Sequence, residues 1–286
     1  MPFKDEDRPV TNMQRITTRY SSSPRHVDGA TTDELRSQFL IESLFAEGEF
    51  RGSYIHDDRM LVAGAVPGDD DLVPSGFEVL GTESLLEHRE AGIINLGGPG
   101  SVVVDGTAHD LDNFDTIYVG RGSEIAVRGK GARFYLVSAL AHTTYPTRVI
   151  LRSEVEPVVI SDDRGAGARR LYRVIWGGGE PTCQLQMGFT VLEPHSVWNT
   201  LPPHLHPRRT EVYLYTDVPA DARVMHFMGE PSNTRHLVVA DGEAVIAPAW
   251  SIHMGAGTAP YSFVWAMAGE NTDYGDTSGV PVTELR

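Results

Sequence analysis

The chain has 286 residues, 41% of them hydrophobic and 22% charged, a composition typical of a folded globular protein rather than a disordered one. Its net charge of −15 at pH 7 argues against a nucleic-acid partner, because affinity for phosphates comes mainly from lysine and arginine. No apolar run reaches the ~18 residues of a membrane span and the first residues lack a secretory signal, so we predict a cytoplasmic protein with no membrane partner.

The N-terminal segment shows little apolar periodicity. Residues 1–27 are polar and contain the run Ser21-Ser22-Ser23-Pro24, so we predict that they form a flexible arm. Thr31 and Glu34 have the spacing of a capping box, in which each side chain bonds the backbone N–H of the other residue. One short helix is therefore predicted after residue 31.

Short apolar alternations begin near residue 50 and are broken by many of the 29 glycines and 18 prolines. Strands of about four to eight residues at this spacing are typical of sandwiches and barrels, whereas parallel sheets need helical patterns between strands. The strand–turn–strand pattern of residues 100–122 is similar to that of residues 236–257. We predict an all-β fold of two related jelly-roll barrels, at 28–150 and 151–286, joined by a connection at 151–170.

The strongest local signal is a group of histidines and one acid. His204 and His206 stand two residues apart, as do side chains on one face of a strand, so both can point at one site. Glu211 opens the next apolar strand, and a hairpin would return its carboxylate beside the two imidazoles. His253 supplies a third imidazole from a later strand. Three nitrogens and one oxygen suit a borderline divalent ion such as Zn²⁺, and Cys183, as the single cysteine, excludes a cysteine-rich site.

The predicted N-terminal barrel lacks these ligands. No His-x-His sequence precedes residue 204, and the corner at 119–125 has no histidine where the second unit has His253. We therefore expect this barrel to be metal-free and to serve packing or assembly.

The pattern His-x-His-x4-Glu followed by Pro-x4-His resembles the two metal motifs of the cupin superfamily. The second motif of that superfamily usually has glycine two residues after the proline, where this chain has Trp250, so we expect an altered pocket wall. A closer resemblance, to the 5-keto-4-deoxyuronate isomerase family of pectin breakdown, extends from about residue 30 to the end of the chain. It is carried by residues 141–147, 182–185, 198–200, 204–213, 234–236 and 250–253.

This resemblance implies a bicupin fold, a homohexamer and one Zn²⁺ per subunit. It also implies an aldose–ketose isomerase that converts 5-dehydro-4-deoxy-D-glucuronate, an acidic sugar, to 3-deoxy-D-glycero-2,5-hexodiulosonate. The implied metal ligands are His204, His206, Glu211 and His253.

The implied reaction moves a carbonyl group from C1 to C2, which requires a proton transfer and the stabilisation of an enediolate. A metal ion suits the second task as a Lewis acid. Glu211 and Tyr213 are the candidates for catalytic residues. Tyr215, His226 and His236 are further candidates, and a structural role is compatible with each of them.

The substrate carboxylate calls for a cation, preferably the bidentate fork of arginine. Gln184 and Gln186 alternate on an apolar strand, so one of them could bond substrate hydroxyls or the outer side of a metal ligand. A solvated surface charge is an equally good interpretation of each arginine taken alone. The candidate arginines are Arg209 and Arg235, followed by Arg173 and Arg208.

Three other functions are compatible with the motifs. A 5-deoxyglucuronate isomerase of inositol catabolism shares the bicupin plan and an acidic sugar substrate. A cupin dioxygenase would bind iron at the same ligands. A non-catalytic sugar-binding or storage cupin usually lacks the complete set of four ligands, so the sequence disfavours it.

Overall fold

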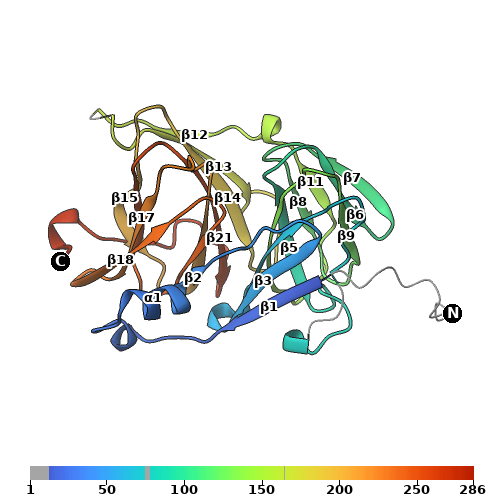
Figure 1. Cartoon of the computed structure of the whole chain (residues 1–286), viewed down its shortest axis with the longest axis horizontal. Coiled ribbons are helices and arrows are strands. Elements are labelled where there is room, and N and C mark those ends of the chain that lie inside the picture. The colour runs from blue at the N-terminus through green and yellow to red at the C-terminus, as the bar shows by residue number, and fades with distance from the viewer. Residues whose placement is uncertain (1–12, 75–77, 164) are drawn as a thin grey trace.

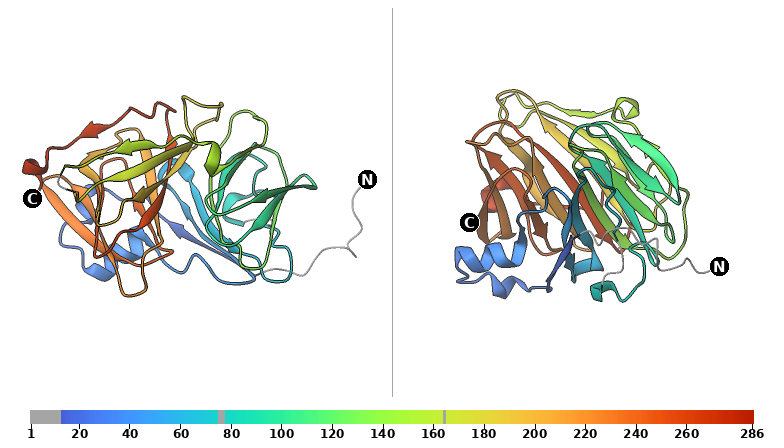
Figure 2. Two further views of the ribbon diagram at one scale, coloured as in Figure 1. Left: turned by 90° about the horizontal axis from the view of Figure 1, so that it is seen from above. Right: turned by 45° about the vertical axis from the view of Figure 1, so that its right-hand side comes forward.

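A computed structural model describes residues 13–74, 78–163 and 165–286 (Figure 1). This part of the chain consists mainly of β-strands arranged in two halves that lie side by side (Figures 1 and 2). None of its helices is long and apolar enough to cross a membrane. Its short 3-10 helices are η2 Pro24–His26, η3 Asp57–Arg59, η4 Glu78–Leu80, η5 Arg152–Glu154 and η6 Val282–Glu284.

The N-terminal half consists of a large sheet facing a small one. Its strands are β1 Met13–Arg19, β3 Glu49–Ile55, β4 Leu61–Val66, β5 Arg89–Asn95, β6 Gly100–Val104, β7 Thr107–Leu111, β8 Thr116–Val119, β9 Ile125–Arg128, β10 Phe134–Leu140 and β11 Arg148–Ile150. The large sheet has the order β1-β3-β4-β10-β5-β8-β11, and the small sheet has the order β7-β6-β9. Buried apolar residues of both sheets, among them Ile93 and Val102, form one cluster between them.

The C-terminal half has the same plan. Its strands are β2 Leu40–Ile41, β12 Val158–Ile160, β13 Arg169–Ile175, β14 Gln186–Leu192, β15 Trp198–Leu205, β16 Arg209–Thr216, β17 Val224–Glu230, β18 Asn233–Val239, β19 Ala244–Ala247, β20 His253–Gly257, β21 Ser262–Gly269 and β22 Ser278–Gly279. The large sheet has the order β12-β13-β14-β21-β16-β19-β2 and the small one β18-β17-β20-β15-β22. The two faces enclose the site described below.

The strand orders repeat between the halves and confirm the predicted all-β bicupin fold. The order β3-β4-β10-β5-β8 recurs as β13-β14-β21-β16-β19, and β7-β6-β9 recurs as β18-β17-β20. In the described residues, no strand pairing closes either half into a ring. The match also shifts the predicted repeat by one strand, because the unit that begins near residue 236 corresponds to β7 onward and not to β6.

The N-terminal segment differs from its prediction in two ways. Residues 13–19 of the predicted flexible arm form β1, which pairs in parallel with β3, whereas residues 1–12 lie outside the described part of the chain. Helix α1, Thr32–Phe39, begins at the predicted capping box of Thr31 and Glu34. It leads into β2, where Leu40 pairs with Val245 of β19, so this segment packs on the C-terminal half although it precedes the N-terminal one in sequence.

The two large sheets pack against each other across an apolar interface. One buried cluster contains side chains of both halves, including Ile94 and Val137 from the first and Met187 and Val212 from the second. Side chains of the second half pack directly on the backbone of Gly92, where an added Cβ would lie 2.8 Å from a side-chain carbon of Ile175. Close packing of this kind makes the halves one structural unit.

A buried carboxylate joins the halves within this interface. Glu90 on β5 accepts a hydrogen bond from the Tyr118 hydroxyl at 2.7 Å. It also accepts bonds from three consecutive backbone N–H groups, those of Cys183, Gln184 and Leu185, each at 2.8 Å. Four donors to one carboxylate supply the partners that a buried charge requires.

Candidate metal centre

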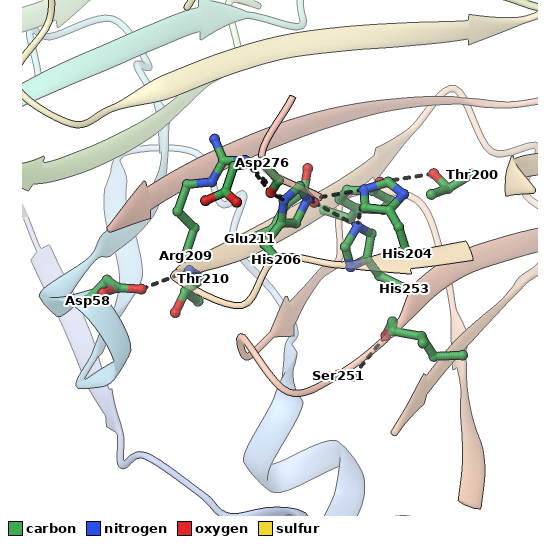
Figure 3. Close-up of polar contacts among 12 residues, drawn as sticks. Asp58, Thr200, His204, His206, Arg209, Thr210, Glu211, Ser251, His253 and Asp276 are labelled. Carbon is green, nitrogen blue, oxygen red and sulfur yellow. Dashed lines mark hydrogen bonds and ion pairs between the residues drawn. The ribbon is translucent and has the colours of Figure 1, made fainter. Parts of the chain in front are cut away.

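The four predicted metal ligands converge inside the C-terminal half (Figure 3). His204 on β15 and His253 on β20 are directly paired across the small sheet. Glu211 lies on β16 in the large sheet, and His206 lies in the connection between β15 and β16. One ligand atom from each residue lies within 4.8 Å of the other three.

The route of the chain between these ligands differs from the predicted hairpin. Strands β15 and β16 belong to opposite sheets and are not paired. The chain crosses from the small sheet to the large one after His206, so Glu211 reaches the imidazoles across the interior. The physical reason is that the inner faces of two packed sheets point at one shared core, which brings their side chains together without a common ladder.

The distances fit a shared cation. The Nε2 atom of His204 lies 3.1 Å from Nε2 of His206 and 3.1 Å from Nε2 of His253. Glu211 Oε2 lies 2.9 Å from His206 Nε2 and 2.8 Å from His253 Nε2. Each Nε2 atom carries at most one proton, so hydrogen bonds cannot account for all of these close contacts. A single divalent ion between the four atoms would accept a lone pair from each of them.

The ionisation of the cluster suits the same conclusion. Burial, followed by the neighbouring His253, lowers the pKa of His204 to about 3, so this imidazole is neutral near pH 7. Burial by itself raises the pKa of Glu211, but His253 and His206 outweigh it and hold that pKa far below its ordinary value. A neutral imidazole and an ionised carboxylate are the forms that bind metals.

The outer nitrogen of His206 faces a backbone carbonyl rather than a carboxylate. Its Nδ1 lies 3.2 Å from the carbonyl oxygen of Asp276, to which Arg209 Nη2 also donates at 3.0 Å. A proton on Nδ1 that donates to this carbonyl leaves the lone pair on Nε2, which faces the cluster. Arg208 pairs with the Asp276 carboxylate at 2.9 Å and so holds the same loop from outside.

The N-terminal half reaches the strand that carries Glu211. Asp58 of η3 accepts a hydrogen bond from the backbone N–H of Thr210 at 2.7 Å (Figure 3). Asp58 has a φ of 45°, a conformation that is costly for a residue other than glycine. The carbonyl of the next residue, Arg59, accepts a bond from the buried Arg89 at 2.6 Å, which holds this turn in place.

A cavity of about 360 Å³ opens beside the cluster. A shift of register between Asn199 and His204 leaves the intervening residues of β15 free to line it. Most of its wall is apolar or aromatic, as in other small-molecule sites. Its lining is formed by Arg169, Leu171, Thr190, Thr200, Leu201, Pro202, His204, His206, Glu211, Tyr213, Phe263, Trp265, Met267, Tyr274, Gly275 and Thr277.

A model of the KduI/IolB family matches residues 78–278, which contain all four clustered side chains. The chain belongs to the KduI/IolB family. Family members named 4-deoxy-L-threo-5-hexosulose-uronate ketol-isomerase match almost end to end. One from Kineococcus radiotolerans is 50% identical, covering 94% of this chain and 99% of its own. One from Bacillus subtilis is 47% identical, covering 95% and 100%.

Solved structures extend the fold of this KduI/IolB family member to more distant proteins. An IolB-like protein from Salmonella typhimurium has a TM-score of 0.65 at 14% identity, covering 77% of this chain and 86% of that one. The oxalate decarboxylase of Lactobacillus farciminis has a TM-score of 0.56 at 10% identity, covering 77% and 79%. At these identities the likeness concerns the fold alone, and it agrees with the predicted cupin architecture.

Of the other residues singled out in this KduI/IolB family sequence, Tyr213 lies at the cavity. Its hydroxyl is 2.9 Å from Thr200 Oγ1. Burial and Glu211 raise the pKa of Tyr213 well above its ordinary value, so the phenol keeps its proton. Tyr215 and His226 instead bond each other at 2.7 Å in the buried interior, and His236 is exposed on β18.

The arginines and glutamines predicted to bind substrate lie outside the cavity lining. Arg209 is fully buried and bonds the Asp276 loop, so it orients His206. Arg235 donates to the carbonyls of Val27 and Ala30 and fastens the segment before α1. The remaining predicted residues are Arg173, stacked 4.1 Å from the Trp176 ring centroid, Gln184, bonded to the Leu140 carbonyl, and Gln186, which is buried.

Several polar residues of the cavity were missed in the sequence, among them Arg169, Thr190, Trp265 and Tyr274. Arg169 was assigned to the connection at 151–170, whereas β13 begins at this residue. Thr190, Trp265 and Tyr274 have no motif that distinguishes them from core residues. The alternation on β13 and β14 was the available signal for Arg169 and Thr190, because it places both on the inner face once the strands are paired.

Proposed function

We propose that this protein is a metal-dependent ketol-isomerase that converts 5-dehydro-4-deoxy-D-glucuronate to 3-deoxy-D-glycero-2,5-hexodiulosonate. The observation that carries the proposal is the group of three imidazoles and one carboxylate at a cavity of about 360 Å³. Relatives 45–50% identical over nearly their whole length bear the name of this activity, which favours it over the other acidic-sugar isomerase.

We propose Zn²⁺ as the ion, one per subunit, bound by His204, His206, Glu211 and His253. Three nitrogens and one oxygen form a donor set that zinc commonly takes. When bound, a redox-inert Lewis acid stabilises the negative charge that develops on the substrate oxygens as the C2 proton leaves. The same donors also bind iron, so metal analysis of the protein, purified without added metal, tests this assignment.

Proton transfer is assigned to residues of the cavity wall. We propose that Glu211 takes the proton from C2 and returns it to C1, since it is the one carboxylate in the described lining. In the same conversion the proton of the C2 hydroxyl is transferred to the oxygen on C1, so that no proton is gained or lost. Tyr213, which keeps its proton, donates a hydrogen bond to a substrate oxygen. Glu211→Gln and Tyr213→Phe separate the two roles in variants whose zinc content matches that of the wild type, a condition that is needed because Glu211 is also a proposed ligand. The first removes exchange of the C2 hydrogen with solvent, and the second slows turnover while exchange continues.

A homohexamer and a cytoplasmic location complete the proposal. Both rest on the resemblance and on the composition of the chain. Light scattering on the purified protein tests the subunit number directly.

The decisive experiment is an assay of the purified protein on three reactions. Isomerisation of 5-dehydro-4-deoxy-D-glucuronate is expected, with no oxygen uptake and with zinc in the purified protein. Faster turnover of 5-deoxyglucuronate would identify the isomerase of inositol catabolism instead. Oxygen consumption with bound iron would identify a dioxygenase.

A further inference from the structure

The inner face of the large sheet carries polar side chains beyond the metal cluster. Trp265 on β21 is the register partner of Tyr213 on β16. Tyr213 is two residues after Glu211, so all three side chains are on the same face of the sheet. Thr190 on the adjoining strand lies two residues further along. Both residues line the cavity that contains the cluster.

The polar atoms of these two residues lack partners within the described part of the chain. Thr190 is fully buried and Trp265 is 3% exposed, yet Thr190 Oγ1 and Trp265 Nε1 have no hydrogen bond there. A buried polar group without a partner costs about 1–3 kcal/mol, and native proteins rarely leave one unpaired. A molecule with hydroxyl or carbonyl oxygens in the cavity would supply both partners.

The indole of Trp265 is held in this position by its neighbours. Its register partner is Gly188, and an added Cβ at Gly188 would lie 2.1 Å from a ring carbon of Trp265. The indole therefore lies across the space that a larger side chain would fill. The ring centroid of Tyr274 lies 5.5 Å from that of Trp265, and this packing constrains the direction of the indole N–H.

Arg169 completes the group from the next strand. Leu171 is the register partner of Thr190, which makes Arg169 a diagonal neighbour of Thr190 on the same face. Of the described residues that line the cavity, Arg169 is the one arginine. Its Nη1 donates to the Gly167 carbonyl at 2.6 Å, which anchors the side chain and leaves other N–H groups of the fork for a ligand.

We propose that Arg169, Thr190 and Trp265 form the subsite for the end of the substrate that does not react. Arg169 binds the carboxylate, while Thr190 and the Trp265 N–H bond oxygens along the chain of the sugar acid. The reacting carbons then lie at the metal cluster. This inference rests on the proposed function for the identity of the sugar acid, but the subsite itself requires only an open or cyclic polyol carboxylate.

The test uses the zinc-loaded full-length protein and three substitutions, Arg169→Met, Thr190→Val and Trp265→Phe. The matched control is Arg170→Met, because Arg170 is the adjacent residue and forms an ion pair with Glu193 on the outer face. KM and kcat are measured on 5-dehydro-4-deoxy-D-glucuronate and on an analogue with a hydroxymethyl group in place of the carboxylate. Zinc content is measured for every variant.

Arg169→Met is expected to raise KM for the uronate by about 10- to 100-fold, the range for a hydrogen bond to a charged group, and to change KM for the neutral analogue far less. Thr190→Val and Trp265→Phe are each expected to raise KM about 3- to 10-fold for both compounds. Zinc content stays at the wild-type value, and Arg170→Met behaves as the wild type. Equal KM values for Arg169→Met and wild type on the uronate would overturn the subsite.

Calorimetric binding of D-glucuronate, with D-glucose as the neutral control, separates this inference from the proposed function. If the wild-type protein does not isomerise the keto-deoxyuronate, the proposed function fails, and the subsite is judged by binding alone. Loss of glucuronate binding in Arg169→Met but not in Arg170→Met supports the subsite. Equal glucuronate affinity in these two variants overturns it.

Discussion

His253 is a polar residue in an otherwise apolar strand, and its position makes it a candidate metal ligand. It is fully buried at the start of β20, and its Nε2 makes close contacts with both His204 and Glu211. The corresponding strand of the N-terminal half, β9, begins with Ile125. Ala91 is the third residue of β5, as Glu211 is the third residue of β16. At these two positions the first half has apolar side chains where the second half has members of the His/Glu cluster.

Replacement of His253 by alanine is expected to lower the affinity for zinc by at least ~100-fold, since even residues outside the ligand set typically contribute 10- to 100-fold. Turnover should fall below detection while the circular dichroism spectrum stays that of the wild type. Metal content after dialysis and steady-state assays measure the two effects. His236→Ala, at an exposed histidine, should retain metal and activity. Full activity in His253→Ala would refute the assigned site.

His226 is a buried histidine whose role is expected to appear in the pH dependence of stability. Burial, followed by His253, lowers its pKa to about 3, and its Nδ1 lies 2.7 Å from the Tyr215 hydroxyl. The unfolded chain binds a proton at this residue below about pH 6.5, whereas the folded protein does not. Its contribution to stability is therefore complete above that pH and is lost as the pH falls toward 3.

In metal-free protein, His226→Gln is expected to reduce the slope of unfolding free energy against pH by up to ~1.4 kcal/mol per pH unit between about pH 6 and 4. Urea unfolding at a series of pH values measures this slope. The slope is the relevant quantity, since the substitution also changes the absolute stability. His236→Gln should leave the slope as it is in the wild type, and an unchanged slope in His226→Gln would contradict the argument.

At the scale of elements, strand β16 is held at its start by the other half of the molecule. Asp58 bonds the N–H of Thr210, the residue immediately before Glu211. The left-handed conformation of Asp58 and the bond from Arg89 to the adjacent carbonyl show that this turn is fixed by its surroundings. The N-terminal half thereby contributes to the placement of Glu211, one of the four proposed metal ligands.

Asp58→Ala is expected to weaken zinc binding about 10-fold, which is in the range for residues that orient ligands. Asp58→Asn is expected to retain most of the wild-type affinity, because the amide oxygen still accepts the hydrogen bond from Thr210. Competition with a fluorescent chelator measures the affinity. Asp241→Ala is the matched control, since Asp241 also bonds a backbone N–H, that of Val218, and pairs with Arg133 of the other half. Equal losses of zinc affinity in Asp58→Ala and Asp241→Ala would rule out a specific role for Asp58.

At the scale of the whole molecule, the two halves depend on each other through the shared apolar cluster and Glu90. Removal of this carboxylate leaves the N–H groups of residues 183–185 without their acceptor in a buried interface. Glu90→Ala is expected to lower the free energy of unfolding by roughly 2–4 kcal/mol. Denaturant unfolding checks this value, and Glu193→Ala, at a surface ion pair, should change it by less than ~0.5 kcal/mol. A loss of unfolding free energy in Glu90→Ala as small as that in Glu193→Ala would show that water replaces the carboxylate.

The sequence by itself determined the strand-rich class of this protein, the capping box of α1 and the identity of the four clustered side chains. These features depend on periodicity and on spacing between neighbours in the chain, which local geometry constrains strongly. The family resemblance was readable for the same reason, because its motifs are short and contiguous.

Only the tertiary structure decided which strands face each other and therefore which polar residues share the cavity. Glu211 meets the histidines across two sheets and not along a hairpin, α1 and β2 pack on the later half, and Arg169 reaches the cavity where Arg209 and Arg235 do not. Each of these outcomes depends on pairing and packing between segments far apart in the chain. An arginine that bonds a backbone loop and one that faces a cavity have the same local sequence signature, and the fold alone distinguishes them.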